Sequence, residues 1–297
     1  MSNVVLECRN VYKKIGNREI INNLNLKLYE GDILGFIGSN GVGKTTSIKL
    51  MLGLQSVSSG MVYLNGFDIE KNFKRAIMSV GAIVENPDLY MYMSGYDHLR
   101  MASFIYGVSE ERIQEVIGLV GLSNRIYDKV KKYSLGMRQR LGIALSILHH
   151  PKILILDEPM NGLDPDGIAD LKRLLLFLAK KEKIAVLISS HLLSELDSIC
   201  NRVCIMSNGT IVLDDSIENI KRVSGIDSYV IELSYVPDDC IYTKVDDNHI
   251  KVRIDKRKLN GLISSFLEND IFIYEIRKES LSLEELFFDV TRGNSYV

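Results

Sequence analysis

Short apolar runs with the length of a β-strand recur through the first part of the chain. In Leu24–Leu28 apolar and polar residues alternate, which is typical of a strand with one buried face. Ile33–Ile37 is apolar almost throughout, as a parallel strand buried on both faces requires. The two kinds of run together predict a mixed sheet. Its expected strands are Val4–Leu6, Leu24–Leu28, Ile33–Ile37, Met61–Leu64 and Val80–Val84.

From Gly95 to about His150 the apolar positions recur at helical spacing instead. One apolar stripe extends from His98 to Tyr106 and a second from Ile113 to Val120. We therefore expect a helical subdomain at about residues 88–150, inserted into the sheet-forming part of the chain.

Strand-like runs resume at Ile153–Leu156 and Ile184–Ile188, on either side of an amphipathic helix from about Gly167 to Lys181. This order predicts a βαβ unit with a parallel sheet. Two further runs, Val203–Met206 and Ile211–Leu213, are expected to complete an α/β domain over residues 1–220.

Beyond a boundary near Ser216–Ser228, the pattern predicts a small α+β domain over residues 221–297. No catalytic spacing of residues is visible there, and we expect a structural, interaction or regulatory role. The expected elements are strands at Tyr229–Leu233, Ile250–Ile254 and Ile271–Ile276 and helices at Leu259–Leu267 and Leu283–Val290.

The composition is that of a globular protein with a large core. Of the 297 residues, 46% are hydrophobic, and 36 basic and 38 acidic residues give a formal net charge of −2. Mixed charges without a basic stripe argue against a nucleic acid partner. The longest apolar runs are far shorter than the roughly 20 residues needed to cross a bilayer, and the N-terminus lacks the pattern of a signal peptide. We expect buried structural thiols, suited to a reducing cytoplasm, at Cys8, Cys200, Cys204 and Cys240.

The segment Gly38–Thr45 matches the spacing Gly-x-x-x-x-Gly-Lys-Thr of a phosphate-binding loop. Consecutive backbone N–H groups and a helix N-terminus favour an anion here, and glycines allow the main chain to approach phosphate oxygens closely. We expect Lys44 to contact the β- and γ-phosphates and the Thr45 hydroxyl to ligate Mg²⁺. The expected nucleotide contacts are Gly38, Ser39, Asn40, Gly41, Val42, Gly43, Lys44, Thr45 and Thr46.

The apolar strand Ile153–Leu156 ends in two acids, Asp157 and Glu158. Asp157 is placed to hold Mg²⁺ through water, and Glu158 can accept a proton from the water that attacks the γ-phosphate. The pair therefore favours hydrolysis over phosphoryl transfer to a second substrate. The alternative, a solvated turn, is disfavoured by the phosphate loop upstream.

The segment Tyr133–Arg140 places a small hydroxyl, Ser134, and a glycine, Gly136, at the start of a helical stripe. Such a start can bind an anion, but it can equally be an ordinary helix cap. Its position shortly before Asp157 and Glu158 favours a second nucleotide contact.

With these motifs in this order and spacing, residues 4–215 resemble the ATP-binding subunit of an ABC transporter. The resemblance implies a P-loop ABC ATPase domain with a mixed sheet core and a helical subdomain. The matching segments are Gly38–Thr45 (Walker A), Ser134–Gln139 (ABC signature), Ile153–Glu158 (Walker B), Asn161–Asp164 (D-loop) and Ser189–His191 (switch histidine).

The resemblance also implies a homodimer of ATP-binding subunits paired head to tail, with each ATP between one chain's phosphate loop and the other chain's signature. Ser134 and Gly136 would then contact nucleotide across the dimer, Asp164 would lie at the same nucleotide, and His191 would sense the γ-phosphate. A cap on the helix Leu192–Cys200 is the alternative role for His191. The implied cofactors are ATP and Mg²⁺, and the implied partner is a polytopic membrane permease that holds the chain peripherally at the cytoplasmic face of the cell membrane.

Two positions depart from the family pattern. After the strand Val80–Val84 the family usually has a glutamine that contacts Mg²⁺ and the attacking water and couples to the membrane subunits, whereas this chain has Glu85. Glu85 is thus an expected catalytic and metal-site residue. Because a carboxylate cannot donate a hydrogen bond and adds charge beside Asp157 and Glu158, we expect altered Mg²⁺ dependence or slower coupling without loss of activity.

The second departure is at the adenine platform, where the family commonly has an aromatic residue before a glycine. This chain has Ile15 before Gly16, and Tyr12, three residues earlier, would face the other side of a strand. Loss of base stacking, worth about 1–3 kcal/mol, should weaken nucleotide affinity and adenine preference.

Glu85, the signature version Tyr133–Gly142 and the segment Ser282–Phe287 are similar to the bacitracin-resistance and lantibiotic self-protection subfamily. This similarity implies export or membrane removal of a peptide antibiotic or a similar amphipathic compound. The alternative is a soluble ABC-type ATPase acting on ribosomes or nucleic acid, but such proteins usually carry two cassettes with a basic linker. A DNA-repair ATPase would need a long coiled-coil insertion, and no sustained heptad run appears.

Overall fold

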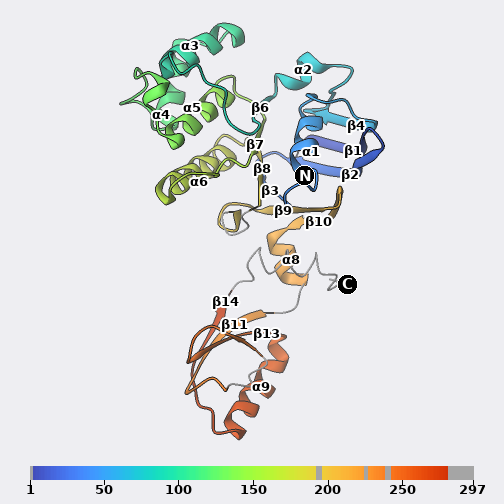
Figure 1. Ribbon diagram of the computed structural model, residues 1–297, viewed down its shortest axis with the longest axis vertical. Helices are drawn as coiled ribbons and strands as arrows, with labels where there is room; N and C mark the ends of the chain where they lie inside the picture. The colour runs from blue at the N-terminus through green and yellow to red at the C-terminus, as the bar shows by residue number, and fades with distance from the viewer. Residues whose placement is uncertain (1–2, 192–195, 224–226, 238–241, 280–297) are drawn as a thin grey trace. The chain divides into compact units, whose positions relative to one another are not determined.

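The computed structural model describes residues 3–191, 196–223, 227–237 and 242–279 (Figure 1). The chain forms two compact units, Met1–Asp215 and Ser216–Val297. The helix expected at Leu283–Val290 and the segment Ser282–Phe287 lie outside the described residues, as do the first residues of the helix expected at Leu192–Cys200 and the thiol of Cys240.

A six-stranded sheet, ordered β10-β9-β3-β8-β7-β6, is the centre of the first unit. The register between β3, β6, β7, β8 and β9 is parallel. All residues of β3, β7 and β8 are buried, which explains why these strands are continuous apolar runs. The strands are β3 (Ile33–Ile37), β6 (Val80–Ile83), β7 (Ile153–Asp157), β8 (Ala185–Ser190), β9 (Arg202–Ser207) and β10 (Thr210–Ser216).

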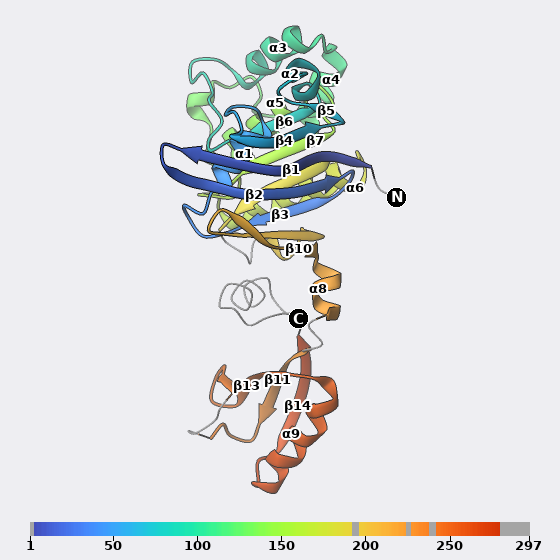
Figure 2. The same ribbon diagram turned by 90° about the vertical axis from the view of Figure 1, so that its right-hand side faces the viewer.

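A second, antiparallel sheet with the order β2-β1-β4-β5 packs in the same unit (Figure 2). Its buried face shares one apolar core with the parallel sheet, including Leu6, Leu26, Phe36 and Leu187. The first two strands are 12 residues each, much longer than their predicted apolar segments, because their outer faces are polar and exposed. The strands are β1 (Val4–Ile15), β2 (Arg18–Tyr29), β4 (Ser59–Leu64) and β5 (Phe67–Asp68).

The helical subdomain is made of α3, α4 and α5, which lie together at the upper left of Figure 1. α3 begins with a capping box in which Ser94 and Asp97 satisfy each other's backbone N–H groups. The predicted architecture, a mixed sheet core with a helical subdomain, is thus confirmed. The helices of this unit are α1 (Lys44–Met51), α2 (Phe73–Ile77), α3 (Gly95–Tyr106), α4 (Glu110–Leu119), η1 (Val130–Lys132), α5 (Leu135–Ile147) and α6 (Pro165–Lys180).

The second unit contains a four-stranded antiparallel sheet, ordered β12-β13-β11-β14, and the helix α9. Its own core joins Tyr229 and Ile231 of the sheet to Leu262 and Phe266 of the helix. None of the helices in the described parts of the two units is long and apolar enough to cross a membrane. The elements are α8 (Ile217–Val223), β11 (Asp227–Leu233), β12 (Thr243–Lys244), β13 (His249–Ile254), α9 (Lys256–Glu268) and β14 (Ile273–Glu279).

A buried arginine joins two helices of the helical subdomain. Arg112 of α4 is 8% exposed, and its guanidinium donates to the carbonyl oxygens of Ile147 (2.8 Å) and Leu148 (3.2 Å) at the end of α5. Its third contact is an ion pair with Glu115 at 2.9 Å. Arg112 therefore satisfies carbonyl groups that a helix end leaves without a partner.

We expect Arg112→Ala to lower the free energy of unfolding by about 2–4 kcal/mol, because two buried carbonyls lose their donor. The control is Arg173→Ala, whose side chain is 76% exposed in a surface ion pair and which should cost less than about 1 kcal/mol. Urea unfolding of both variants measures the difference, and equal losses would contradict the capping role.

Candidate functional site

The phosphate loop joins the end of the central strand β3 to the first turn of α1. Gly41 and Gly43 have φ angles of 82° and 111°, a left-handed conformation that favours glycine. At Gly38 a Cβ atom would lie 2.7 Å from Cγ2 of Val42 and 2.8 Å from the carbonyl oxygen of Met206. The glycines of the motif are thus required by the shape of the loop itself.

Lys44 is held against this loop. Its side chain is 6% exposed, and Nζ donates to the carbonyl oxygens of Gly38 (2.6 Å) and Ser39 (3.4 Å). Nζ also lies 3.6 Å from Oε1 of Glu158. A buried ammonium group is therefore placed between the phosphate loop and the acid that follows β7.

The loop borders a cavity of about 410 Å³, within the usual size range of ligand sites. Three parts of the first unit line it: the β1–β2 hairpin, the phosphate loop with the start of α1, and the segments that follow β7 and β8. The lining residues are Ile15, Arg18, Ile20, Asn40, Gly41, Gly43, Lys44, Thr45, Thr46, Glu158, Asn161 and His191. Arg18 and Ile20 are not among the residues predicted from sequence, and Asn161 was identified only as the first residue of the D-loop segment.

Asp157 is the buried acid of the site, 2% exposed at the end of β7. Its Oδ2 accepts a hydrogen bond from the Thr45 hydroxyl at 2.9 Å, and its Oδ1 accepts one from the Ser189 hydroxyl at 2.5 Å. Carboxylate and hydroxyl oxygens are the ligands that Mg²⁺ prefers. The Thr45–Asp157 contact therefore fits the predicted metal, and these two side chains could hold it.

Glu85 does not join this contact. It follows β6 with a φ angle of 65°, its side chain is 67% exposed, and its Oε1 lies 3.3 Å from Nζ of Lys49. Within the described ranges, no group of three histidine, cysteine, aspartate or glutamate side chains is arranged to hold a metal ion. The structure thus brings together Thr45 and Asp157 of the predicted metal site and leaves Glu85 apart.

Glu158 lines the phosphate-loop cavity, whereas Asp157 is not among its lining residues. Its φ angle of 50° is uncommon for a residue with a side chain and costs backbone energy. The Glu158 N–H donates to Oγ of Ser189 at 2.9 Å, and Oε2 of its carboxylate lies 2.8 Å from Nδ1 of His191. The predicted base and the predicted switch histidine are therefore in direct contact.

Ser189 connects the two acids, although its role was not predicted. One hydroxyl donates to Asp157 and accepts from the backbone N–H of Glu158. The contact depends on the parallel register that pairs Asp157 with Ser189 between β7 and β8. The only sequence signal was its place in the Ser189–His191 segment.

The signature residues lie elsewhere on the first unit. Ser134 is the N-cap of α5 and accepts from the N–H of Met137 at 3.2 Å, so the helix cap that was the alternative to a nucleotide contact is present. Asp164 caps α6 in the same way by accepting from Gly167 at 3.0 Å. Ser134, Gly136 and Asp164 together line a separate cavity of about 500 Å³, which the phosphate loop does not border.

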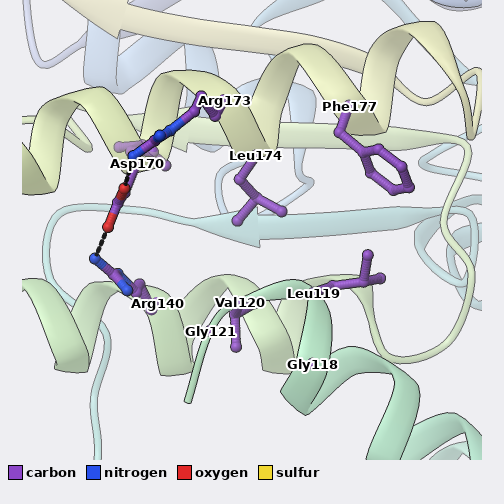
Figure 3. A pocket seen from close by; sticks show the side chains of 10 residues that line it. Gly118, Leu119, Val120, Gly121, Arg140, Asp170, Arg173, Leu174 and Phe177 are labelled. Atoms are coloured by element: carbon purple, nitrogen blue, oxygen red, sulfur yellow. Dashed lines mark hydrogen bonds and ion pairs between the residues drawn. The ribbon is translucent and has the colours of Figure 1, made fainter. Parts of the chain in front are cut away.

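A third cavity, of about 430 Å³, lies between the end of α4, α5 and α6 (Figure 3). At one end Arg140 of α5 pairs with Asp170 of α6, which also pairs with Arg173. The rest of its lining is apolar, with Leu174 and Phe177 facing Leu119. It holds no acid, base or nucleophile beyond this compensated ion cluster, whereas the phosphate-loop cavity is lined by Lys44, Glu158 and His191.

Comparison with known proteins places these features in a family. Residues 21–161 match the family model described as ABC transporter. The chain is 42% identical to an uncharacterized ABC transporter ATP-binding protein of Bacillus subtilis, YhcH, over 97% of this chain and 96% of the relative. It is 35% identical to the bacitracin transport ATP-binding protein BcrA of Bacillus licheniformis, over 98% of this chain and 98% of the relative.

Two further matches agree with these. The lantibiotic transport ATP-binding protein SrtF of Streptococcus pyogenes is 39% identical over 74% of this chain and 95% of the relative. A solved structure of an ATP-binding subunit of an ABC transporter is 27% identical and superimposes with a TM-score of 0.68, covering 74% of this chain and 93% of that one.

Removal of the Ser189 hydroxyl tests the connection between the two acids. We expect Ser189→Ala to lower the rate of ATP hydrolysis by at least about tenfold, because both Asp157 and Glu158 lose a fixed partner. Nucleotide binding should change much less. Ser146→Ala is the control, since this buried serine bonds only within its own helix to Ile143 at 2.8 Å. Equal hydrolysis rates in both variants would contradict the role of Ser189.

Proposed function

This chain belongs to the family of ABC transporter ATP-binding proteins, and from that premise we propose that it powers export or membrane removal of a peptide antibiotic or a similar amphipathic compound. The transport step would take place in a separate membrane permease. The observation that supports the site assignment is the convergence of Lys44, the Thr45–Asp157 contact and the Glu158–His191 contact on one cavity.

Each group has a chemical role in hydrolysis. Lys44 binds the β- and γ-phosphates, and the backbone N–H groups of the loop orient them. Glu158 accepts the proton of a water molecule as its oxygen bonds to the γ-phosphorus, and the bond from that phosphorus to the β–γ bridging oxygen breaks to give ADP and phosphate. His191 positions the Glu158 carboxylate by the 2.8 Å contact and senses the γ-phosphate.

Mg²⁺ belongs to this proposal as a cofactor. Thr45 and Asp157 would hold it, and when bound it would neutralise charge on the phosphate oxygens. Glu85 then acts from a distance, through its negative charge, since its carboxylate is engaged by Lys49.

A homodimer completes the site in this proposal. Within one chain Ser134, Gly136 and Asp164 line a cavity that is separate from the phosphate loop. In a head-to-tail pair with two-fold symmetry, the signature of each copy would face the phosphate loop of the other. Two nucleotides would then be enclosed by the pair.

The cargo assignment rests on the relatives. Two of them are named as transport proteins for bacitracin and for a lantibiotic, and the first matches along nearly the whole chain. A surface for the permease is suggested by exposed apolar side chains after Glu85 and on α3, with Tyr92 69% exposed and Phe104 and Ile105 each 76% exposed. Through the permease the chain would lie at the cytoplasmic face of the membrane.

Glu158→Gln separates binding from hydrolysis. The amide cannot accept the proton, so we expect hydrolysis to fall by at least about 100-fold, while ATP binding persists and an ATP-dependent dimer accumulates. Light scattering with and without ATP measures the dimer, and Glu70→Gln on the exposed surface is the control. A variant that hydrolyses ATP at the wild-type rate would exclude Glu158 as the base.

The membrane partner is tested separately with the wild type. We expect it to co-purify with a membrane protein, and co-sedimentation with ribosomes instead would exclude a permease as its partner.

Glu85→Gln tests the departure at the coupling position. Because the change removes a charge that would act on the metal site from a distance, we expect the Mg²⁺ concentration for half-maximal hydrolysis, or the hydrolysis rate, to shift by about two- to fivefold. Lys49→Gln, which frees the Glu85 carboxylate from its ion pair, should shift the same quantity in the opposite direction. Unchanged metal dependence and rate in both variants would show that Glu85 has no influence on the site.

A further inference from the structure

The phosphate-loop cavity has two chemically different ends. The phosphate end is formed by glycines, Lys44 and Thr45, and the opposite end is formed by the β1–β2 hairpin through Ile15, Arg18 and Ile20. None of the residues described along this cavity is phenylalanine, tyrosine or tryptophan, and its one ring, that of His191, lies in contact with Glu158. A base bound there meets an aliphatic side chain and a guanidinium group instead of a stacking ring.

The three hairpin residues lie on one face. Ile15 and Arg18 are directly opposite each other in the antiparallel register, next to the turn of the hairpin. Ile20 is two residues beyond Arg18 on β2, and residues at that spacing point to the same side of a strand. The carbonyl oxygen of Ile20 lies 3.4 Å from the position that a Cβ on Gly43 would take, so this face adjoins the phosphate loop.

The Arg18 guanidinium is available for a ligand. Arg18 is exposed, and its side chain makes no hydrogen bond or ion pair with any residue of the described ranges. The adjacent charged residues of the hairpin differ in this respect, because Lys14 and Glu19 form an ion pair at 3.9 Å. A free cation thus borders the end of the cavity at which a nucleotide base would lie.

The donors of arginine match one purine better than the other. A guanidinium has five N–H donors and no acceptor. Guanine presents two adjacent acceptors, O6 and N7, whereas adenine presents N7 beside the donor group at N6. Arginine can therefore form two hydrogen bonds to guanine but meets a second donor on adenine. The aliphatic side chain of Ile15 has no hydrogen-bonding group and would not distinguish the two bases.

We propose that Arg18 recognises the purine base and that this protein accepts GTP at least as readily as ATP. Its substrates are then ATP and also the purine nucleoside triphosphates that carry both O6 and N7, such as GTP. The inference rests on the proposed function, because it requires a nucleoside triphosphate in this cavity.

The experiment measures kcat/KM for ATP, GTP, inosine triphosphate and 7-deaza-GTP in the wild type, Arg18→Met and Lys14→Met. In the wild type we expect a GTP to ATP ratio of one or more. Arg18→Met should lower this ratio by about tenfold, the effect of losing a bidentate contact to a base. Inosine triphosphate, which keeps O6 and N7, should follow GTP, and 7-deaza-GTP, which lacks N7, should fall below it.

Two controls separate base recognition from general attraction of phosphate. Lys14→Met removes a charge from the same hairpin outside the cavity and should leave the ratio unchanged. Ile15→Tyr restores a stacking ring and should lower KM for both nucleotides, since stacking does not depend on the edge of the base.

A wild type that prefers ATP by more than tenfold would overturn the inference, as would equal losses for ATP and GTP in Arg18→Met. A protein that hydrolyses neither nucleotide would contradict the proposed function instead, so the two failures are distinguishable.

Discussion

The buried carboxylate of Asp157 is the group on which the site depends. A charge that is 2% exposed at the end of a central strand is costly unless polar partners surround it. Its partners are the hydroxyls of Thr45 on α1 and Ser189 on β8. Satisfying this one acid therefore fixes the phosphate loop, β7 and β8 relative to each other, and the positions of Lys44 and His191 follow from it.

The two adjacent acids serve different purposes because the strand ends between them. Asp157 is still in β7, where its side chain faces Thr45, while the left-handed backbone of Glu158 turns its carboxylate toward Lys44 and His191. A backbone in this conformation costs energy and persists only where its surroundings hold it. The hydrogen bond from the Glu158 N–H to the Ser189 hydroxyl supplies that restraint. The strained backbone and the proposed general base are therefore the same residue.

The sequence predicted those parts of the fold and the site whose pattern lies entirely within one continuous run of residues. The buried strands β3, β7 and β8 are continuous apolar runs, and the phosphate loop has fixed spacing, so both were predicted. β1 and β2 were predicted only in part because their exposed faces are polar, and β12 is only two residues long. The role of Ser189 depends on the pairing of two strands that are distant in sequence. The position of Glu85 depends on the backbone turn after β6. A local sequence pattern contains neither kind of information.

The two ends of the cavity also differ in how much sequence change the fold allows. At the phosphate end, a side chain on Gly38 or Gly43 would overlap neighbouring atoms, and the side chains of Lys44 and Asp157 are buried and hydrogen-bonded. At the base end, Ile15 is 53% exposed at the tip of a hairpin, and the Arg18 side chain makes no polar contact with the described residues. Replacement there changes little in the core, so base recognition can vary between relatives while phosphate chemistry is kept. The departure at Ile15 is therefore compatible with an intact fold and with an intact hydrolytic site.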